Sequence, residues 1–573
     1  MQEMDNTQQG LGRFIPILGW LPGYPRGWFR IDIVAGLTAA AVVIPQAMAY
    51  ATIAGLPVEV GLYTALVPMM IYAILGTSRP LSVSTTSTIA MLTAVALAGA
   101  VSSSDPYDYI VPAATLALIT GIFLVLAGIL RLGFIANFIS DPVLTGFKAG
   151  IGVVIFVGQL GKVLGLSLEK GPIRETLWSM LQNLDQINLA TTAIAGITLA
   201  ILIFLPRFSK KVPAALVAVA FGILLSMAFD LTSLGVTLVG SIPSGLPSLS
   251  LPDLSLISAL WPSALGIALM SFVESIAAAR AFTHRGEAGP QPSQELFALG
   301  IANIGGSFTQ AMPAGGGTSQ TAVTDQAGAK SQLAGVVTAG VVVVTLLFLA
   351  PLISLMPEAT LGALVLVAAA GLIKVEEFRR IRAVRTTEFR WAVVAFFGVI
   401  ILGTLEGILL AVLLSLLVLL YYAEHPPVYI LGRKPGTNVF RPLEEHPDDE
   451  TYPGLLMLKT EGLLFFANIQ SFLEQVESFV REEQPKILLI DCSTIPSIEY
   501  SAIKQLREFD EELQDAGITF WMASLTASLF HIHERTPLGQ SMGHERLFLD
   551  LEQAVSSYLQ LEEKKRARDK ENR

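Results

Sequence analysis

The sequence predicts an α-helical membrane protein with a small α/β domain at its C-terminal end. Of the 573 residues, 52% are hydrophobic and only 15% are charged, whereas soluble domains are about one quarter charged. Residues 1–423 hold 21 acidic and 21 basic residues, and residues 424–573 hold 26 acidic and 16 basic residues. The whole net charge of −10 therefore lies in the last part of the chain. This asymmetry indicates a neutral membrane domain joined to an acidic soluble one.

Several functional classes are excluded by the same composition. The chain has no basic stripe of the kind that binds nucleic acid. Its single cysteine, Cys492, excludes an intramolecular disulfide and a cysteine-rich metal site. Phosphate-binding glycine loops, HExxH and GxSxG motifs are absent from the sequence. We therefore expect no enzyme, no cofactor, no metal site and no nucleic-acid partner.

Apolar runs of about 20 residues can cross the hydrocarbon core as helices. Fourteen apolar runs are found, near residues 33–54, 58–76, 82–100, 110–131, 138–163, 189–206, 213–232, 261–282, 294–308, 316–327, 332–352, 359–373, 388–403 and 406–423. The runs at 294–308 and 316–327 are too short to cross alone, so they predict partial helices. Two halves of seven spans each would be inverted relative to one another, as in transporters built from inverted repeats.

The same patterning predicts four segments. We expect a cytoplasmic N-terminal segment at 1–30, a transmembrane domain at 31–423, a soluble domain at 424–561 and a charged, disordered tail at 562–573. Basic residues favour the cytoplasmic side of a membrane, and one set of loops holds Arg30, Arg79, Arg207, Arg280, Lys330 and the cluster from Lys374 to Arg390. An even number of spans then places both termini in the cytoplasm of a multi-pass protein of the cell membrane.

Two apolar runs are interrupted at matching places, the third position of each half. In the third run, hydroxyl residues from Ser82 to Thr88 precede an apolar stretch, and in the tenth, Gly315-Gly316-Gly317 leads into Thr318-Ser319-Gln320. A helix that starts inside the membrane has unpaired N–H groups and a positive dipole end, which suit an anion. The hydroxyls of Thr85, Thr86, Thr318 and Ser319 would add neutral donors. The alternative is structural, with hydroxyls bonding to their own helix and glycines allowing close packing.

Three further polar residues lie in the apolar runs. Glu274 is the only charged residue between Asp253 and Arg280, and an intramembrane carboxylate is a functional candidate. Burial favours the protonated form of a carboxyl group, so Glu274 is a candidate proton carrier. The alternative is a structural pair with Lys148, Lys162 or Arg280, or a hydrogen bond to a half-helix. Gln46 and Tyr50 share one helix face, although such residues alone more often serve packing.

The C-terminal part changes to short β-type runs and amphipathic helices from Val428. Predicted strands lie at 455–458, 462–466, 487–491 and 518–521, and predicted helices at 470–483, 499–515, 525–534 and 550–561. Alternation of strands and helices over this length predicts a small α/β domain with a sheet covered by helices.

Several motifs together resemble those of the sulfate permease (SulP) family of anion transporters, over nearly the whole chain. They are Ile44-Pro-Gln-Ala-Met-Ala-Tyr50 with Gly61-Leu-Tyr63, then Ser271-Phe-Val-Glu-Ser275 and Ser319-Gln-Thr-Ala-Val323. The C-terminal part is similar to a STAS domain, through Leu431-Gly-Arg-Lys-Pro-Gly436 and Phe465-Phe-Ala-Asn468.

This resemblance implies a fourteen-span inverted-repeat fold whose core and gate subdomains move in an elevator-like cycle, usually as a homodimer. It places the anion between the third and tenth spans beside the first. The resulting substrate-binding candidates are Gln46, Tyr50, Thr85, Thr86, Gly317, Thr318, Ser319 and Gln320. Glu274 matches an acidic position that takes part in cation coupling in some family members.

The chain departs from the family at three functional places. The third span reads Val83-Ser84-Thr85 where relatives often have Val-Gly-Pro or Val-Gly-Thr. Gln320 stands where many relatives have arginine, which removes a fixed positive charge beside the site. Tyr500 stands where bacterial STAS regulators have a phosphorylatable serine, so serine phosphorylation is not expected there.

The leading hypothesis is proton-coupled uptake of sulfate. Sodium-coupled transport of bicarbonate or a dicarboxylate, and a passive anion channel, are the alternatives. A membrane-tethered regulator acting through the STAS domain is a further class, disfavoured because an anchor has no use for interrupted spans.

Overall fold

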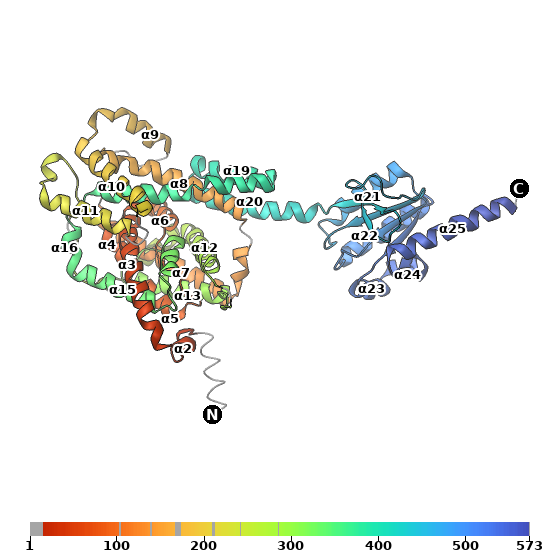
Figure 1. The fold of residues 1–573 in the computed structure, drawn as a ribbon, viewed down its shortest axis with the longest axis horizontal. Helices are drawn as coiled ribbons and strands as arrows, with labels where there is room; N and C mark the ends of the chain where they lie inside the picture. The colour runs from red at the N-terminus through yellow and green to blue at the C-terminus, as the bar shows by residue number, and fades with distance from the viewer. Residues whose placement is uncertain are drawn as a thin grey trace, which may run out of the picture. The chain divides into compact units, whose positions relative to one another are not determined.

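The computed structural model describes residues 15–101, 103, 105–137, 140–166, 173–208, 213–240, 242–284 and 286–571. The chain divides into unit 1, residues 1–416, and unit 2, residues 417–573 (Figure 1). The division falls inside the last apolar helix, close to the predicted boundary at 423. Residues 1–14 of the predicted N-terminal segment and residues 572–573 of the predicted tail lie outside the described residues.

The regular elements in the described residues of unit 1 are helices and two very short strands, β1 (Val83–Ser84) and β2 (Gly315–Gly316). Its first half contains α2 (Ile17–Trp20), α3 (Arg26–Ile53), α4 (Val58–Thr64), α5 (Val67–Leu75), α6 (Ser87–Ala100), η1 (Pro106–Tyr109), α7 (Ile110–Ile129), η2 (Leu132–Asn137), α8 (Asp141–Leu164), α9 (Ile173–Gln182), η3 (Leu184–Gln186), α10 (Leu189–Phe208), α11 (Ala214–Ala228) and η4 (Thr232–Leu234). Its second half contains η5 (Leu254–Leu256), α12 (Ile257–Ala281), α13 (Pro292–Ser307), α14 (Thr318–Gln326), α15 (Leu333–Val344), the π-turn η6 (Thr345–Leu349), α16 (Ala350–Ile353), α17 (Glu358–Leu372), α18 (Val375–Val384), α19 (Thr386–Leu402) and α20 (Thr404–Glu424).

The helical membrane fold predicted from the sequence is confirmed. Among the described residues, eight helical segments are long and apolar enough to cross a membrane, and three shorter apolar helices accompany them, at Ser87–Ala100, Ala214–Ala228 and Leu413–Glu424. The short predicted runs correspond to α13 and α14, and α14 is only nine residues long. The number of fourteen spans and the inverted repeats remain predictions.

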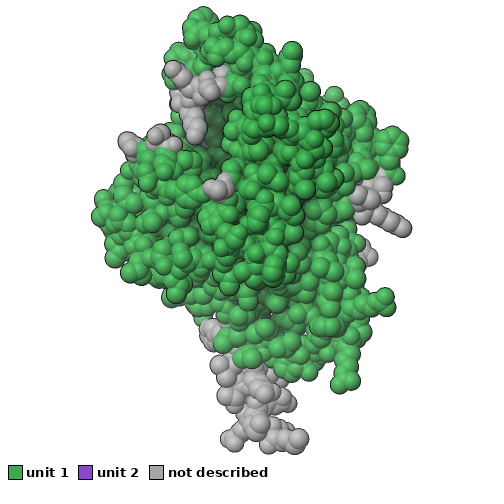
Figure 2. Space-filling view, turned by 90° about the vertical axis from the view of Figure 1, so that its left-hand side faces the viewer, with its two compact units in different colours: residues 1–416 green, residues 417–573 purple. Residues whose placement is uncertain are grey.

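Glycines let the helices of unit 1 approach backbone to backbone, and these approaches define two groups. In the α3 group (α3–α7, α12–α15, β1 and β2), a Cβ on Gly36 would lie 2.6 Å from the Ala334 oxygen, and one on Gly121 would lie 2.7 Å from the Gly300 oxygen. In the α8 group (α8, α10, α11, α17 and α19), a Cβ on Gly152 would lie 2.8 Å from the Ala369 oxygen. The labelled helices α3, α5, α7, α13 and α15 gather in the lower part of unit 1 in Figure 1, and α8, α10, α11 and α19 in its upper part. Figure 2 shows one outer face of unit 1 with all its atoms drawn as spheres.

Unit 2 contains a six-stranded sheet in the order β4-β3-β5-β6-β7-β8. Strands β3 (Val428–Arg433) and β4 (Phe440–Pro442) are antiparallel, whereas β5 (Leu455–Thr460), β6 (Ile487–Asp491), β7 (Thr519–Ala523) and β8 (Leu547–Phe548) are parallel to one another. The helices are α21 (Ile469–Glu483), α22 (Tyr500–Asp515), α23 (Ala527–Glu534), α24 (Pro537–Met542), η7 (His544–Arg546) and α25 (Leu551–Glu571).

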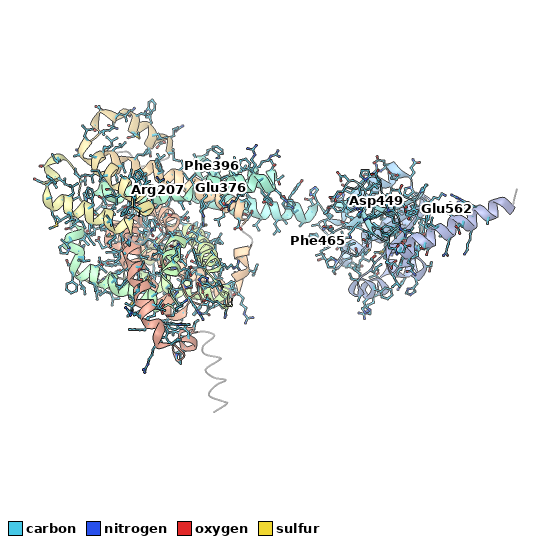
Figure 3. All side chains as sticks on the ribbon, in the orientation of Figure 1. Arg207, Glu376, Phe396, Asp449, Phe465 and Glu562 are labelled. Atoms are coloured by element: carbon cyan, nitrogen blue, oxygen red, sulfur yellow. The ribbon has the colours of Figure 1, made fainter. Side chains whose placement is uncertain are left out.

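Alternation along the parallel strands builds one core on each face of this sheet. Leu456 and Leu458 of β5 pack with α21 and α22 on one face, and Leu455 and Met457 pack with α25 on the other. Unit 2 also contains ion pairs, including Arg441 with Asp449 and Lys486 with Glu562. Figure 3 labels both acidic residues. The predicted small α/β domain is thus present.

Two local predictions in this domain differ from the structure. Residues 462–466 hold an isolated bridge from Leu464 to Ile498 instead of a full strand, and a turn follows at 466–468. Gly462 has a positive φ of 97°, and the Asn468 side chain bonds to the backbone of Phe465 and Leu463. The tail predicted to be disordered from Glu562 continues α25 to Glu571. Lys486 Nζ lies 2.9 Å from Glu562 Oε1 and fixes the start of this extension.

Candidate functional site

Strands β1 and β2 bring the two interrupted segments together. They pair antiparallel, with Val83 opposite Gly316 and Ser84 opposite Gly315. The glycines are required by the close approach of α12: a Cβ on Gly315 would lie 2.9 Å from Ser271 Oγ, and one on Gly316 would lie 3.0 Å from Ser275 Cα. Because α6 and α14 begin directly after these strands, their N-termini are held next to the same small sheet.

The N-termini of α6 and α14 differ in their capping. Thr86 caps α6, since its Oγ1 accepts a hydrogen bond from the Ile89 N–H at 3.2 Å. No side chain caps α14, whose N-cap residue is Gly317. Thr318 and Ser319 at its start are exposed, whereas the next residues, Gln320 and Thr321, are buried. The first N–H groups of α14 are therefore available to a ligand, together with two hydroxyl groups.

Buried polar side chains of α12 and α13 support the second strand. Asn303 accepts a hydrogen bond from the Ala314 N–H at 2.8 Å and donates one to the Ala314 carbonyl at 3.1 Å. Ser271 Oγ donates to the same carbonyl at 2.7 Å, and Ser275 Oγ accepts from the Gly316 N–H at 2.6 Å. The sequence reasoning missed these supports, although Ser271 and Ser275, four residues apart in an apolar helix, form a recognisable signal.

Glu274 lies directly at the start of α6. Its Oε2 accepts a hydrogen bond from Thr86 Oγ1 at 2.9 Å, and its Oε1 accepts one from Thr88 Oγ1 at 2.9 Å. Lys148 Nζ on α8 lies 3.5 Å from Glu274 Oε1. Both structural alternatives named for Glu274, a basic partner and a bond to a half-helix, are thus present at once. They also place its carboxyl beside one of the two helix N-termini.

The first span contributes the remaining side of the site. The Tyr50 hydroxyl lies within hydrogen-bonding range of the Ser319 side chain, and the charge of Glu274 is near enough to act on it. A cavity of about 130 Å³ is lined by Gln46, Ala49 and Tyr50 of α3 and by residues from the facing α8 group: Leu202, Ala215, Leu364, Val367 and Ala368. The cavity therefore lies between the two helix groups, and the predicted pair Gln46 and Tyr50 shares its wall.

Two predicted site residues have unpaired buried polar atoms, a hydroxyl that can donate on Thr85 and an amide oxygen that only accepts on Gln46. Thr85 Oγ1 and Gln46 Oε1 are both buried and without a hydrogen-bond partner among the described residues. Unpaired buried polar atoms are costly unless a ligand or water meets them. Gln320 instead is tied to β1, because its Oε1 accepts a hydrogen bond from Ser84 Oγ at 2.7 Å.

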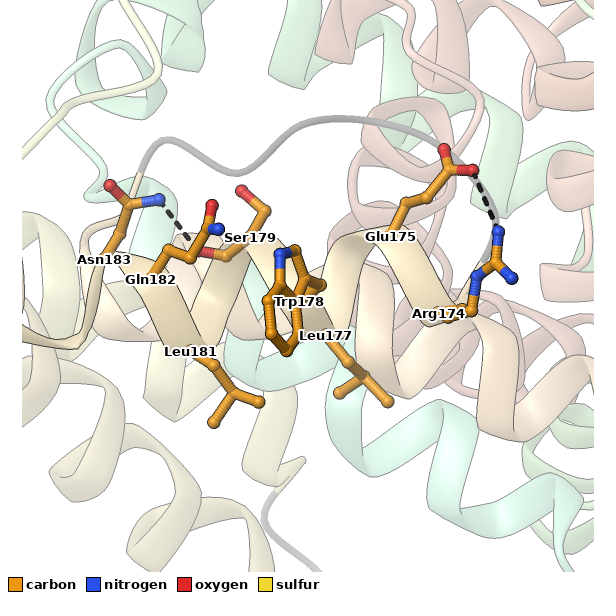
Figure 4. A pocket seen from close by; sticks show the side chains of 8 residues that line it. All are labelled: Arg174, Glu175, Leu177, Trp178, Ser179, Leu181, Gln182 and Asn183. Carbon is orange, nitrogen blue, oxygen red and sulfur yellow. Dashed lines mark hydrogen bonds and ion pairs between the residues drawn. The ribbon is translucent and has the colours of Figure 1, made fainter.

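A larger hollow, of about 610 Å³, lies elsewhere, along α9. Its lining residues all belong to one stretch of chain from Arg174 to Asn183, shown in Figure 4. Its charged groups, Arg174 and Glu175, are 3.9 Å apart and exposed. The hollow brings together no side chains from distant parts of the sequence, so it is a weaker candidate than the site beside β1 and β2.

Comparisons with known proteins agree with the resemblance. The model of the sulfate permease family matches residues 29–395, and that of the STAS domain matches residues 446–554. Over 550 residues the chain is 36% identical to a probable sulfate transporter of Mycobacterium tuberculosis, covering 94% of this chain and 98% of the relative. It is 31% identical over 567 residues to probable sulfate transporter 4.2 of Arabidopsis thaliana, covering 94% and 83%.

Solved structures share the fold. Murine Solute Carrier 26 family member A9, an anion transporter in the inward-facing state, has a TM-score of 0.84 at 22% identity and covers 96% of this chain and 94% of its own. The transmembrane domain of a cyanobacterium bicarbonate transporter has a TM-score of 0.59 at 24% identity and covers 67% of this chain and 97% of its own. The family predicted from the motifs is confirmed: the chain belongs to the sulfate permease family of anion transporters and carries a C-terminal STAS domain.

Proposed function

We propose that the protein is a secondary active transporter that takes up an inorganic oxyanion, sulfate first, together with protons. One observation carries the proposal: the start of α6, joined through β1 and β2 to the uncapped start of α14, is bonded to the buried carboxyl of Glu274. An anion site and a protonatable group thus share one location. The curated relatives named as sulfate transporters, in Mycobacterium tuberculosis and Arabidopsis thaliana, favour sulfate as the first substrate to test.

In this proposal the anion is held by neutral donors. The free N–H groups at the start of α14, together with Thr318 and Ser319, face it from one side. Thr85 offers an unpaired hydroxyl, and Tyr50 offers its hydroxyl. Gln46 can donate to an anion only through its amide NH2 group, not through its unpaired oxygen. Gln320 positions the strands through Ser84.

Coupling is assigned to Glu274. A proton on its carboxyl would neutralise the one acidic charge at the site, and an anion could then enter without repulsion. The hydroxyls of Thr86 and Thr88 can bond to either protonation state, because a hydroxyl both donates and accepts.

Transport is assigned to movement of the α3 group against the α8 group in an elevator-like cycle. Each group is held together by close glycine contacts, whereas the cavity of about 130 Å³ lies between them. We further propose that the protein is a homodimer in the cell membrane with both termini in the cytoplasm, as the basic loops suggest.

The test is uptake of radiolabelled sulfate into proteoliposomes, with and without an inward proton gradient. Gradient-driven uptake that excess unlabelled sulfate suppresses would establish a proton-coupled sulfate carrier. Folded protein that takes up bicarbonate with sodium, and no sulfate, would replace the substrate and the coupling ion. A steady anion current that is independent of any cation gradient would indicate a channel instead.

A further inference from the structure

We propose that Lys148 of α8 is a substrate-binding residue, and that its ammonium group exchanges between Glu274 and the transported anion. This inference rests on the proposed function and deepens it. It supplies the fixed positive charge that Gln320 does not provide at the site.

Position is the first argument. Lys148 Nζ lies 3.5 Å from Glu274 Oε1, and Glu274 in turn is bonded to Thr86 at the start of α6 at 2.9 Å. Only the Glu274 side chain therefore separates the Lys148 ammonium from the helix start where the anion is proposed to bind. Within the part of the chain that the structure describes, Lys148 Nζ has no partner besides Glu274, although an ammonium has three donors.

The backbone around Lys148 fixes where its side chain points. On the same helix, a Cβ on Gly146 would overlap the Ala392 oxygen of α19, and one on Gly150 would lie 2.8 Å from the Phe396 oxygen. Phe147 and Ile151 are fully buried. Lys148 thus extends from the α8 group toward Glu274, which belongs to the α3 group. The ion pair crosses the division along which the elevator movement is proposed.

The charges around Glu274 explain how Lys148 could pair alternately with Glu274 and with the anion. Glu274 has Lys148 of α8 as an ion-pair partner, and its charge acts on the phenol of Tyr50 of α3, while α6 contributes the hydroxyls of Thr86 and Thr88. With Glu274 ionised, its carboxylate holds the ammonium and competes with any anion. A proton on Glu274 removes that competitor, so the ammonium is free to pair with the anion. One proton and one negative charge of the substrate therefore enter together.

A double-substitution comparison tests this role. The binding of sulfate to purified protein is measured for wild type, Glu274→Gln, and the double variant Glu274→Gln with Lys148→Met. Glu274→Gln leaves Lys148 without its carboxylate, so sulfate binding should be retained. Removing Lys148 as well should weaken binding by about tenfold or more relative to Glu274→Gln, since a hydrogen bond to a charged group is worth that much. The arginine double variant, Glu274→Gln with Lys148→Arg, should restore most of the affinity.

The same comparison can also overturn the proposed role of Lys148. If Lys148 only neutralises Glu274, the double variant will bind sulfate as tightly as Glu274→Gln, and the inference is overturned. Lys162→Met, placed in the Glu274→Gln background, removes the same charge from the same helix and should leave the dissociation constant within about twofold. The Lys148 double removes the Glu274 carboxylate together with its ion-pair partner, and the folding of every variant is checked by size-exclusion chromatography before binding. Folded wild type that binds neither sulfate nor bicarbonate would refute the proposed function itself.

Discussion

Glu274 carries a charge that the membrane interior tolerates only with partners, and three side chains supply them. Two hydroxyls and one ammonium lie within 3.5 Å of its carboxylate. The residue itself could be identified from sequence, because it is an isolated charge in a long apolar run. Its basic partner could not be chosen among Lys148, Lys162 and Arg280, since that choice depends on how α8 meets α12 in space.

Glu274→Gln should remove the proton dependence of transport. The amide keeps the shape of the side chain and bonds to Thr86 and Thr88, but it does not titrate. Wild-type sulfate uptake should rise several-fold from about pH 8 to about pH 6, whereas uptake by the variant should change by less than about twofold. The measurement is initial uptake rate in proteoliposomes across this range.

Glu59→Gln is the matched control, because Glu59 is another buried carboxyl of the α3 group outside the proposed site. Its pH profile should follow that of wild type. If Glu274→Gln keeps the wild-type pH profile, the coupling role of Glu274 is wrong.

Asp449 gives unit 2 a pH-dependent element of stability. The hydrogen bond and charge of Arg441, at 2.6 Å, hold the pKa of the Asp449 carboxyl below its usual value. A carboxyl whose pKa is lower in the folded state stabilises the fold above the pKa of the unfolded chain, near about 3.9, and that stabilisation is lost as the pH falls through the folded-state pKa. Asp449→Asn should therefore lower stability at neutral pH and flatten its loss below about pH 4.

The buried thiol of Cys492 can report this change. Cys492 is the single cysteine of the chain, it is fully buried in unit 2, and burial raises its pKa. Its reaction with dithiodipyridine at about pH 7, where the stabilisation by Asp449 is fully present, therefore measures opening of unit 2. Asp448→Asn makes the same change of net charge at an exposed neighbour and should leave the labelling rate unchanged. Equal rates for Asp449→Asn and wild type would contradict the assignment.

At the scale of elements, the interrupted spans were the most informative feature of the sequence. Glycines and hydroxyl residues at matching positions predicted that α6 and α14 begin inside the unit, and the structure pairs β1 with β2 at that point. Sequence reasoning did not reach the strand support by Asn303, because an amide in an apolar helix has many available partners. Residues 462–466 look like a strand by composition, but they pair only through an isolated bridge at Leu464, and the Asn468 side chain stabilises the turn that follows.

Helix α8 should tolerate substitution at some glycines and not at others. Gly146→Ala places a methyl group against the Ala392 carbonyl of α19, so backbones must separate at a cost of about 1–3 kcal/mol. Gly158 lies on the same helix, and a Cβ added there would have nothing within 4 Å, so Gly158→Ala should be neutral or slightly stabilising. Thermal unfolding in detergent would compare the two. A lower melting temperature for Gly158→Ala than for Gly146→Ala would show that the packing of α8 is misjudged.

For the whole molecule, the division into a membrane part and a soluble part could be predicted from the distribution of charge, because lipid and water favour opposite compositions. The grouping of the helices could not be predicted from the sequence, since it depends on which glycine meets which backbone carbonyl across the bundle. Gly146 and Ala392 are far apart in sequence, and their residue types do not reveal the contact. The site between the groups was therefore predicted from its two interrupted spans, whereas its α8 side, including Lys148, required the structure.

The orientation in the membrane is the prediction that belongs to the whole molecule. The basic cluster from Lys374 to Arg390 should face the cytoplasm, and the segment between α11 and α12 should face outside. Val384 and Leu249 are highly exposed, at 76% and 85%, so Val384→Cys and Leu249→Cys give one reporter for each side. The buried Cys492 serves as an internal blank. In intact cells a membrane-impermeant maleimide should label Leu249→Cys, and it should label Val384→Cys only after the membrane is permeabilised. The reverse pattern would mean that the basic cluster and the STAS domain face outside. That result would contradict the positive-inside assignment, and the proposed inward proton coupling would lose its basis.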